Sequence, residues 1–341
     1  MLTRNLEMTL TGYQGGQISK VMGNKTIKVF GPVPSRRLGR SLGINNIPPK
    51  ICTYACVYCQ LGRTIRIQLE RMDYYQIDDV VLAVRDKVES LKKSRGNIDY
   101  LSFVPDGEPT LDVNLGKEID LIKALGIKIA VISNASLIGN KAVRDDLVKA
   151  DWVSLKVDAV TEKCWRKIDR SHGSLKLRDI LDGIKLFSNT FKGNLVTETM
   201  LVKGINDSQN EISEIANFLA ELNLDKAYIA IPTRPPAEKW VKPPCEHNIN
   251  TAYQIFSETL DEVEYLTGYE GNAFASTGDA EDDLLSIIAV HPMREEAVCE
   301  FISKSNAGYE LIDKLLHEGK LIETEYQGRK FYTRRLSERN N

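Results

Sequence analysis

The 341-residue sequence predicts an α/β fold with a parallel sheet, in a length that suits one α/β barrel followed by a small α+β domain. Two observations support the parallel α/β fold: short apolar strands alternate with amphipathic helices, and the connections between them are short. Such alternation implies right-handed βαβ units whose strands lie side by side in a parallel sheet. A third observation marks the second domain, because helices then follow one another and are succeeded by two strands.

The elements follow from local patterns. Short runs rich in apolar and β-branched residues predict six strands, and apolar residues at helical spacing predict the helices between them. The strands are expected at 41–44, 100–104, 128–132, 151–158, 195–202 and 226–232, and the helices at 78–91, 116–125, 175–187, 210–222 and 249–266. We expect a lead-in over 1–30 that includes a hairpin or strand, the barrel over 31–270, a linker over 271–281 and the second domain over 282–341.

Composition excludes several classes of protein. Hydrophobic residues make up 42% and charged residues 27% of the chain, as in soluble globular proteins, and no apolar run approaches the length of a membrane span. The first residues lack the apolar core of an export signal, so we expect a cytoplasmic protein without membrane contact. A net charge of −2 argues against general polyanion binding but leaves room for a local basic patch.

Three closely spaced cysteines form the strongest motif. Cys52, Cys56 and Cys59 are separated by three and then two residues. A zinc site normally has four ligands, and no second Cys or His pair follows nearby; a disulfide framework is not expected without an export signal. A [4Fe-4S] cluster held by three thiolates leaves one iron open to a second molecule. The spacing therefore favours an iron–sulfur cluster, with zinc as the alternative.

The pattern C-x3-C-x-Tyr-C, which includes Tyr58, resembles the cluster loop of the radical S-adenosylmethionine (SAM) superfamily. The resemblance implies an open, partial (β/α)6 TIM-type barrel, a [4Fe-4S] cluster on the three cysteines, and SAM chelated at the open iron. Electron transfer into SAM then releases a 5′-deoxyadenosyl radical, while the protein places and shields it. An electron donor such as flavodoxin or ferredoxin is implied as a partner, and Tyr58 is expected in the cofactor site.

A second motif follows the expected strand at 100–104. Asp106, Gly107, Glu108 and Pro109 resemble the superfamily's Gly-Gly-Glu strand end, with Asp106 where the first glycine often stands. Glycine allows close backbone approach, and a carboxylate accepts hydrogen bonds from an ammonium group. The resemblance assigns Gly107, Glu108 and Pro109 to SAM, together with Asn134 at the end of the strand at 128–132.

Polar residues also occur at later strand ends, which face the site in barrel folds. Lys156 and Asp158 end an otherwise apolar strand, so they require either a function or a buried ion pair. We expect them to be catalytic. Glu198 and Thr199 hold the corresponding place on the next strand, and a proline-rich connection over 233–245 is expected to cover the barrel mouth.

Three arginines precede the cluster loop. The planar guanidinium group suits carboxylate or phosphate, so Arg36, Arg37 and Arg40 are candidates for binding an anionic substrate. The alternative is a solvated or ion-paired turn.

The C-terminal segment resembles a winged helix. Helices are expected at 282–290, 294–303 and 306–318, and strands at 321–326 and 330–333. A basic end fits a nucleic-acid contact, whereas a protein-docking or packing module is the competing interpretation. The basic residues are Arg329, Lys330, Arg334, Arg335 and Arg339.

Within the superfamily, the Gly-Glu-Pro-Thr-Leu and Lys-Val-Asp segments resemble relatives of the wyosine-type tRNA synthases. Those enzymes use pyruvate, a lysine and a second cluster bound by upstream cysteines; no cysteine precedes Cys52, so that reaction is not carried over. We expect modification of a tRNA or nucleotide. Two alternatives stay open: a radical enzyme that modifies a protein or peptide, and a cluster-containing DNA-binding regulator that senses SAM or redox state.

Overall fold

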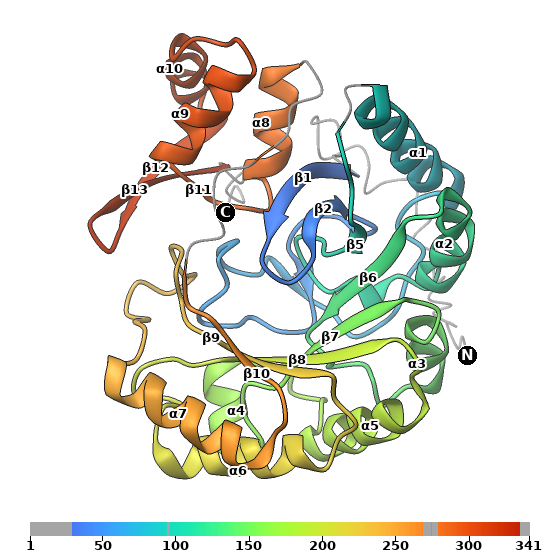
Figure 1. Ribbon diagram of the computed structural model, residues 1–341, viewed down its shortest axis with the longest axis vertical. Coiled ribbons are helices and arrows are strands. Elements are labelled where there is room, and N and C mark those ends of the chain that lie inside the picture. The colour runs from blue at the N-terminus through green and yellow to red at the C-terminus, as the bar shows by residue number, and fades with distance from the viewer. Residues whose placement is uncertain (1–28, 94–95, 269–273, 275–278, 335–341) are drawn as a thin grey trace, which may run out of the picture.

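The computed structural model describes residues 29–93, 96–268, 274 and 279–334. Its main feature is a curled eight-stranded sheet in the order β1-β2-β5-β6-β7-β8-β9-β10, with helices on its outer side (Figure 1). Neighbours from β2 to β10 pair in parallel, whereas β1 pairs antiparallel with β2. The predicted α/β partial barrel is therefore confirmed. The strands are β1 Val29–Ser35, β2 Gly39–Ile44, β5 Tyr100–Phe103, β6 Lys128–Ser133, β7 Trp152–Lys156, β8 Asn194–Met200, β9 Lys226–Ala230 and β10 Val263–Leu266.

The helices of the barrel bury one apolar face against the sheet. In α1, Val80, Val84 and Val88 recur at helical spacing and are buried, and acidic residues occupy the first turn, where the helix dipole favours them. No helix in the described ranges is both long and apolar enough to cross a membrane. The helices are α1 Ile77–Lys93, α2 Leu115–Ile122, α3 Lys141–Leu147, α4 Glu162–Ile168, α5 Leu177–Thr190, α6 Gln209–Ala220 and α7 Glu246–Thr259, with 3₁₀ turns η1 Pro109–Leu111 and η2 Lys123–Leu125.

The predicted helix over 249–266 is wrong in its last third. Helix α7 ends at Thr259, and Val263–Leu266 forms β10, a further parallel strand beside β9. The helix stops where Leu260 takes an extended conformation, and the next residues pair with β9 along their whole length. Helices α3 and α4 were not predicted, because each has only seven residues and a weak periodic signal.

The β1–β2 turn closes the end of the barrel at which the parallel strands begin. Leu38 in this turn belongs to a cluster inside the barrel with Trp152, Val196 and Leu266. Because β2 runs parallel to β5, the turn lies at the N-terminal end of the parallel strands. In barrel folds this end serves stability, and chemistry takes place at the opposite end.

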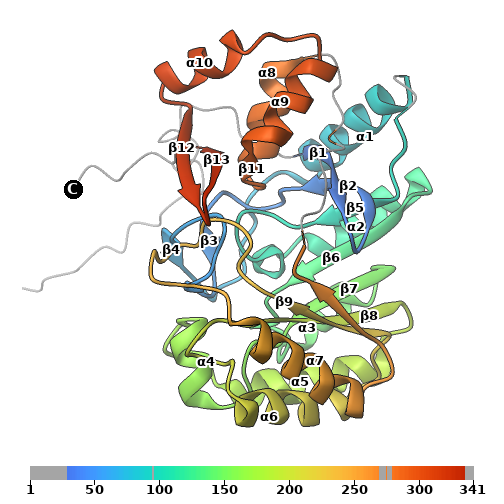
Figure 2. The same cartoon turned by 60° about the vertical axis from the view of Figure 1, so that its left-hand side comes forward.

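The C-terminal domain, defined here as residues 279–334, packs on the barrel beside β1 (Figure 2). Its buried core includes Phe30 and Val33 of β1, and Leu61 and Val104 of the barrel pack against it. Three helices and a three-stranded sheet in the order β11-β13-β12 make up the domain. Its elements are α8 Ala280–Ile288, β11 Met293–Arg294, α9 Glu295–Lys304, α10 Glu310–His317, β12 Leu321–Tyr326 and β13 Arg329–Arg334.

The helices and the final hairpin occur close to their expected positions, and β11 is an addition. The winged-helix interpretation and the domain boundaries stay predictions. Residues 1–28, Arg335, Arg339 and most of the expected linker lie outside the described residues.

A buried ion pair anchors the C-terminal domain to the barrel. Lys87 Nζ of α1 lies 2.7 Å from Asp283 Oδ1 of α8, whose side chain is 1% exposed. Lys87→Ala should lower the unfolding free energy by about 3 kcal/mol, because it removes a counter-charge from a carboxylate that stays buried.

Urea denaturation checks this value. The matched control is Lys141→Ala, which removes an exposed i,i+4 pair with Asp145 and should change stability by less than about 0.5 kcal/mol. Equal effects of the two substitutions would contradict the anchoring role of Lys87.

Candidate active site

One cavity of about 280 Å³ lies at the C-terminal ends of the barrel strands. The three clustered cysteines line it, as do residues from strand ends that sequence reasoning assigned to SAM and substrate. The structure therefore brings most of the predicted site together. The predicted residues that line it are Arg36, Arg37, Cys52, Cys56, Tyr58, Cys59, Gly107, Glu108, Asn134 and Lys156.

Backbone hydrogen bonds fix the cysteine loop. Cys52 ends β3, Ile51–Cys52, which pairs in parallel with β4, Arg66–Ile67. Beyond it, the amides of Ala55 and Val57 donate to Asp169 O (3.0 Å) and Ile168 O (2.9 Å) at the end of α4. The loop is thus held on both sides.

The protein environment disfavours free thiolates in this loop. Burial, with Glu108 nearby, raises the pKa of Cys52 to about 12, and burial also raises the pKa values of Cys56 and Cys59. A metal centre removes this constraint, because it replaces the proton on each sulfur. Within the described ranges no three His, Cys, Asp or Glu side chains are grouped around a single-ion site, although the three thiols share the cavity.

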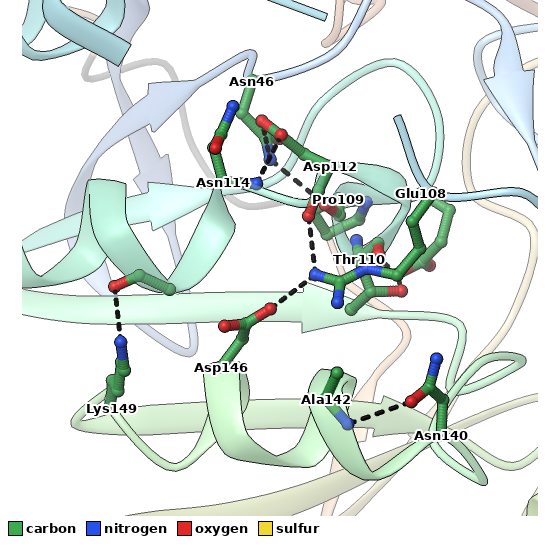
Figure 3. Close-up of polar contacts among 12 residues, drawn as sticks. Asn46, Glu108, Pro109, Thr110, Asp112, Asn114, Asn140, Ala142, Asp146 and Lys149 are labelled. Atoms are coloured by element: carbon green, nitrogen blue, oxygen red, sulfur yellow. Dashed lines mark hydrogen bonds and ion pairs between the residues drawn. The ribbon is translucent and has the colours of Figure 1, made fainter. Parts of the chain in front are cut away.

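The turn after β5 fits tightly against the cysteine strand. Gly107 has a φ of +154°, and a Cβ at this position would lie 2.0 Å from Ile51 O, so a side chain does not fit. The next amide, Glu108 N, donates to the same Ile51 oxygen at 3.2 Å. Asn46 supports the turn by donating to Pro109 O (3.1 Å) and to Asp112 (3.3 Å), as Figure 3 shows.

The Glu108 carboxylate joins the ends of β5 and β6. It accepts hydrogen bonds from Thr110 Oγ1 (2.7 Å), Ser133 Oγ (2.7 Å) and Asn134 N (2.8 Å). Burial raises the pKa of Glu108, and these donors oppose the increase. Glu108 therefore lines the predicted SAM side of the cavity while its carboxylate holds Asn134 in place.

Asn134 lies against the cysteine loop. Its Nδ2 donates to Thr53 Oγ1 at 2.8 Å and lies 3.5 Å from Cys52 Sγ. The side chain predicted to contact SAM is thus adjacent to the first thiol.

Asp106, which departs from the usual glycine, has a buried partner. Lys50 Nζ lies 3.1 Å from Asp106 Oδ1, and both side chains are almost fully buried. Burial raises the pKa of Asp106, whereas Lys50 lowers it. Sequence reasoning missed Lys50, because nothing in the local pattern shows that it reaches the turn after β5.

Lys156 is the centre of a charged network. Its Nζ lies 2.9 Å from Glu198 Oε1 and 3.9 Å from Asp158 Oδ1, and 4.8 Å from the centre of the Tyr58 ring. Burial alone would lower the pKa of Lys156, but Asp158 and Glu198 together raise it above its ordinary value. These two carboxylates therefore favour the ammonium form of Lys156.

Asp158 belongs to the same network but lies outside the cavity lining. It accepts hydrogen bonds from Tyr58 Oη and from Met200 N (2.7 Å), and it is not among the described residues that line the cavity. Burial raises the pKa of Asp158, and Lys156 lowers it. The buried ion pair that the sequence left as one alternative is present.

The three predicted arginines have separate positions. Arg37 pairs with Glu198 and Arg36 donates to Tyr265 O (3.3 Å), so both enter the cavity from the β1–β2 turn. Arg40 instead pairs with Asp99 (3.1 Å) at the N-terminal end of β2, away from the cavity. The predicted position of Arg40 near the barrel mouth is wrong, because its guanidinium group is held by Asp99 on the exposed surface at the start of β2.

Two further arginines line the cavity and were missed. Arg234 follows β9, and its position just after a predicted strand was the available signal. Arg294 belongs to the C-terminal domain, and no sequence pattern shows that this domain reaches the cavity.

The lowered pKa of Glu198 predicts how the stability of the protein changes at acid pH. Burial would raise its pKa, but Lys156 and Arg37 lower it from 4.5 to about 2. The unfolded state therefore binds more protons between these values, and stability is lost as the pH falls through that range. The stability advantage of the wild type over Glu198→Gln should shrink as the pH falls from about 5 toward 3.

Denaturant titrations at several pH values measure this advantage, with Glu214→Gln on the exposed face of α6 as the control. A difference that stayed constant across the range would show that Glu198 is not held ionised by its neighbours.

Comparison of the sequence with known proteins finds a matching family model and two relatives that align over most of their length. The family model described as Radical SAM superfamily matches residues 46–219. A UPF0026 protein of Methanocaldococcus jannaschii is 47% identical over 91% of this chain and 97% of that protein. A UPF0026 protein of Helicobacter pylori is 33% identical over 85% of this chain and 92% of that protein. A radical SAM methyltransferase structure from Sphaerobacter thermophilus has a TM-score of 0.49 and 13% identity, covering 67% of this chain and 66% of that one.

Proposed function

This chain belongs to the radical SAM superfamily, and we propose that Cys52, Cys56 and Cys59 hold its [4Fe-4S] cluster. Enzymes of the superfamily use such a cluster together with SAM. When bound, the reduced cluster supplies the one electron that cleaves SAM to methionine and a 5′-deoxyadenosyl radical. The observation that carries the proposal is that three thiols share one cavity with the Gly107 turn and Asn134.

The chain's own residues bind and orient SAM in this proposal. Gly107 exposes backbone where a side chain would collide, and Pro109 stiffens the turn that follows. Asn134 offers an amide beside Cys52, and its position depends on Glu108. Tyr58 lines the site and is held in place by its hydrogen bond to Asp158.

Lys156 and Asp158 have different roles on the substrate side of the cavity. Lys156 presents a fixed ammonium group to the cavity and contacts an anionic or carbonyl group of the substrate. Asp158 acts as a positioning residue, because it reaches the cavity only through Lys156 and Tyr58.

A tRNA or nucleotide is the proposed substrate. Arg36 and Arg37 supply positive charge inside the cavity, and the exposed Arg329 on the last hairpin supplies it outside. Arg334, at the end of the same hairpin, is partly buried. The expected electron donor, a flavodoxin or ferredoxin, and the expected cytoplasmic location stay predictions.

The charge of α10 disfavours the DNA-binding regulator. In a winged helix the third helix enters the DNA major groove. Helix α10 carries Glu310 and Asp313, and its Lys314 is 2.7 Å from Glu281. Its polar surface is thus not basic.

The cluster assignment predicts a loss of iron and of SAM cleavage. Anaerobically reconstituted wild type should bind about four irons and, with dithionite and SAM, release 5′-deoxyadenosine. The variant with Cys52, Cys56 and Cys59 all changed to Ala should do neither, whereas Cys299→Ala, an exposed cysteine of α9, should match the wild type. Bound zinc in the wild type, or iron retained by the triple variant, would refute the assignment.

The substrate class predicts salt-dependent tRNA binding. If Arg329 contacts a phosphate, Arg329→Ala should reduce the slope of log affinity against log salt by about one. Filter binding measures the slope, with Arg178→Ala on the exposed face of α5 as the control. Absence of tRNA binding at low salt would favour the peptide-modifying alternative.

A further inference from the structure

Lys50 connects the turn after β5 to the far end of the cysteine loop. Its Nζ forms the ion pair with Asp106, and its backbone amide donates to Asp106 O at 2.6 Å. On the other side, the Lys50 carbonyl accepts hydrogen bonds from Ile65 N and Arg66 N, both at 3.1 Å. Main-chain and side-chain contacts together therefore fix Lys50 behind the loop, and it is not among the described residues that line the cavity.

The backbone at this position does not require a lysine. Lys50 has a φ of +64°, in the left-handed region that residues with a Cβ adopt only at a cost. A glycine would adopt this conformation without strain. What a lysine adds here is its side chain, which is 2% exposed and carries a charge.

The Lys50 ammonium group has donors that its printed partner does not use. An ammonium group carries three N–H donors. Asp106 Oδ1 lies 3.1 Å from Nζ as an ion-pair partner, but the contact lacks the geometry of a hydrogen bond, and no other acceptor among the described residues bonds to Nζ. Because buried donors are almost always paired, a further acceptor is expected beside Nζ.

The surroundings of Nζ point to Cys59. A Cβ at Gly62 would lie 4.0 Å from Lys50 Nζ, and Gly62 N donates to Cys59 O at 3.1 Å. Burial raises the pKa of the Cys59 thiol; among the charged groups around it, Lys50 has the largest effect and lowers that pKa, while Asp106 has the next largest and raises it. The positive end of the ion pair is therefore the end that acts more strongly on Cys59.

We propose that Lys50 donates a hydrogen bond to a cluster sulfur at Cys59 and, with Asp106, sets the reduction potential of the cluster. Reduction adds one electron, and so one negative charge, which a nearby ammonium group stabilises. Net charge and hydrogen bonds to the sulfurs both tune such potentials. The inference rests on the proposed function in taking Cys52, Cys56 and Cys59 as the cluster ligands. It also gives a role to Asp106, the residue that departs from the glycine of the superfamily motif.

The two members of the ion pair should shift the potential in opposite directions. Lys50→Met keeps the length of the side chain but removes its charge, so the one-electron reduction equilibrium should become about tenfold less favourable, a shift of about 59 mV toward more negative potential. Asp106→Asn removes the opposing charge and should make the potential less negative. Redox titration of the reconstituted protein, followed by electron paramagnetic resonance, measures both shifts.

Two further variants separate charge from structure. Lys50→Arg keeps a cation with N–H donors and should stay close to the wild-type potential. Lys141→Met removes the lysine of an exposed ion pair with Asp145 on α3 and should leave the potential unchanged. If Lys50→Met does not retain a complete cluster, the direction of the Asp106→Asn shift decides.

Three outcomes would overturn the role of Lys50 and leave the cluster assignment intact. They are unchanged potentials in cluster-loaded variants, shifts of Lys50→Met and Asp106→Asn in the same direction, and loss of the cluster from both variants, which is the result expected of a purely structural ion pair. Wild-type protein without an iron–sulfur cluster would refute the proposed function, and the role of Lys50 with it. Iron and sulfide content, measured before each titration, distinguishes these results.

Discussion

The candidate site depends on one close backbone contact, between Gly107 and the carbonyl of Ile51. No side chain fits there, and the next amide binds the same oxygen, so the turn after β5 and the strand that ends in Cys52 form one rigid unit. The Glu108 carboxylate extends this unit to β6 and to Asn134. Thiols and polar groups from distant parts of the chain thereby keep fixed relative positions before any cofactor binds, which lowers the cost of binding it.

A second constraint acts inside the barrel, where the Glu198 side chain is only 12% exposed and has two cationic neighbours. Burying a carboxylate is costly unless it is paired, and Lys156 and Arg37 meet this need from opposite ends of the barrel. Lys156 comes from the C-terminal end of β7, whereas Arg37 belongs to the β1–β2 turn, which closes the barrel at the N-terminal end of the parallel strands. The same pairing holds Lys156 in its charged form, so the stability of the barrel interior and the electrostatics of the cavity have one origin.

The sequence predicted what local pattern determines. The cysteine spacing, the Gly107 turn and six parallel strands depend on neighbouring residues, and the observed strands lie close to the expected ranges. It failed where position depends on the course of the chain in space. Arg40 is near the cysteines in sequence but at the other end of β2, and Lys50 meets Asp106 only because the loop folds back. The place of Arg294 in the cavity could not be predicted for the same reason. It depends on how the C-terminal domain packs on the barrel, and no sequence pattern shows that packing.

The way the C-terminal domain packs limits what can enter the cavity. Phe30, Leu61 and Val104 of the barrel contribute to the apolar cluster of that domain, and Asp283 is buried against α1. Moving the domain away would expose this apolar surface and separate a buried ion pair, both of which cost free energy. A large substrate must therefore present a single protruding group to the cavity while the two domains stay together. An unstacked nucleotide of an RNA loop meets this requirement, because its base and phosphate can enter while the rest of the chain stays outside.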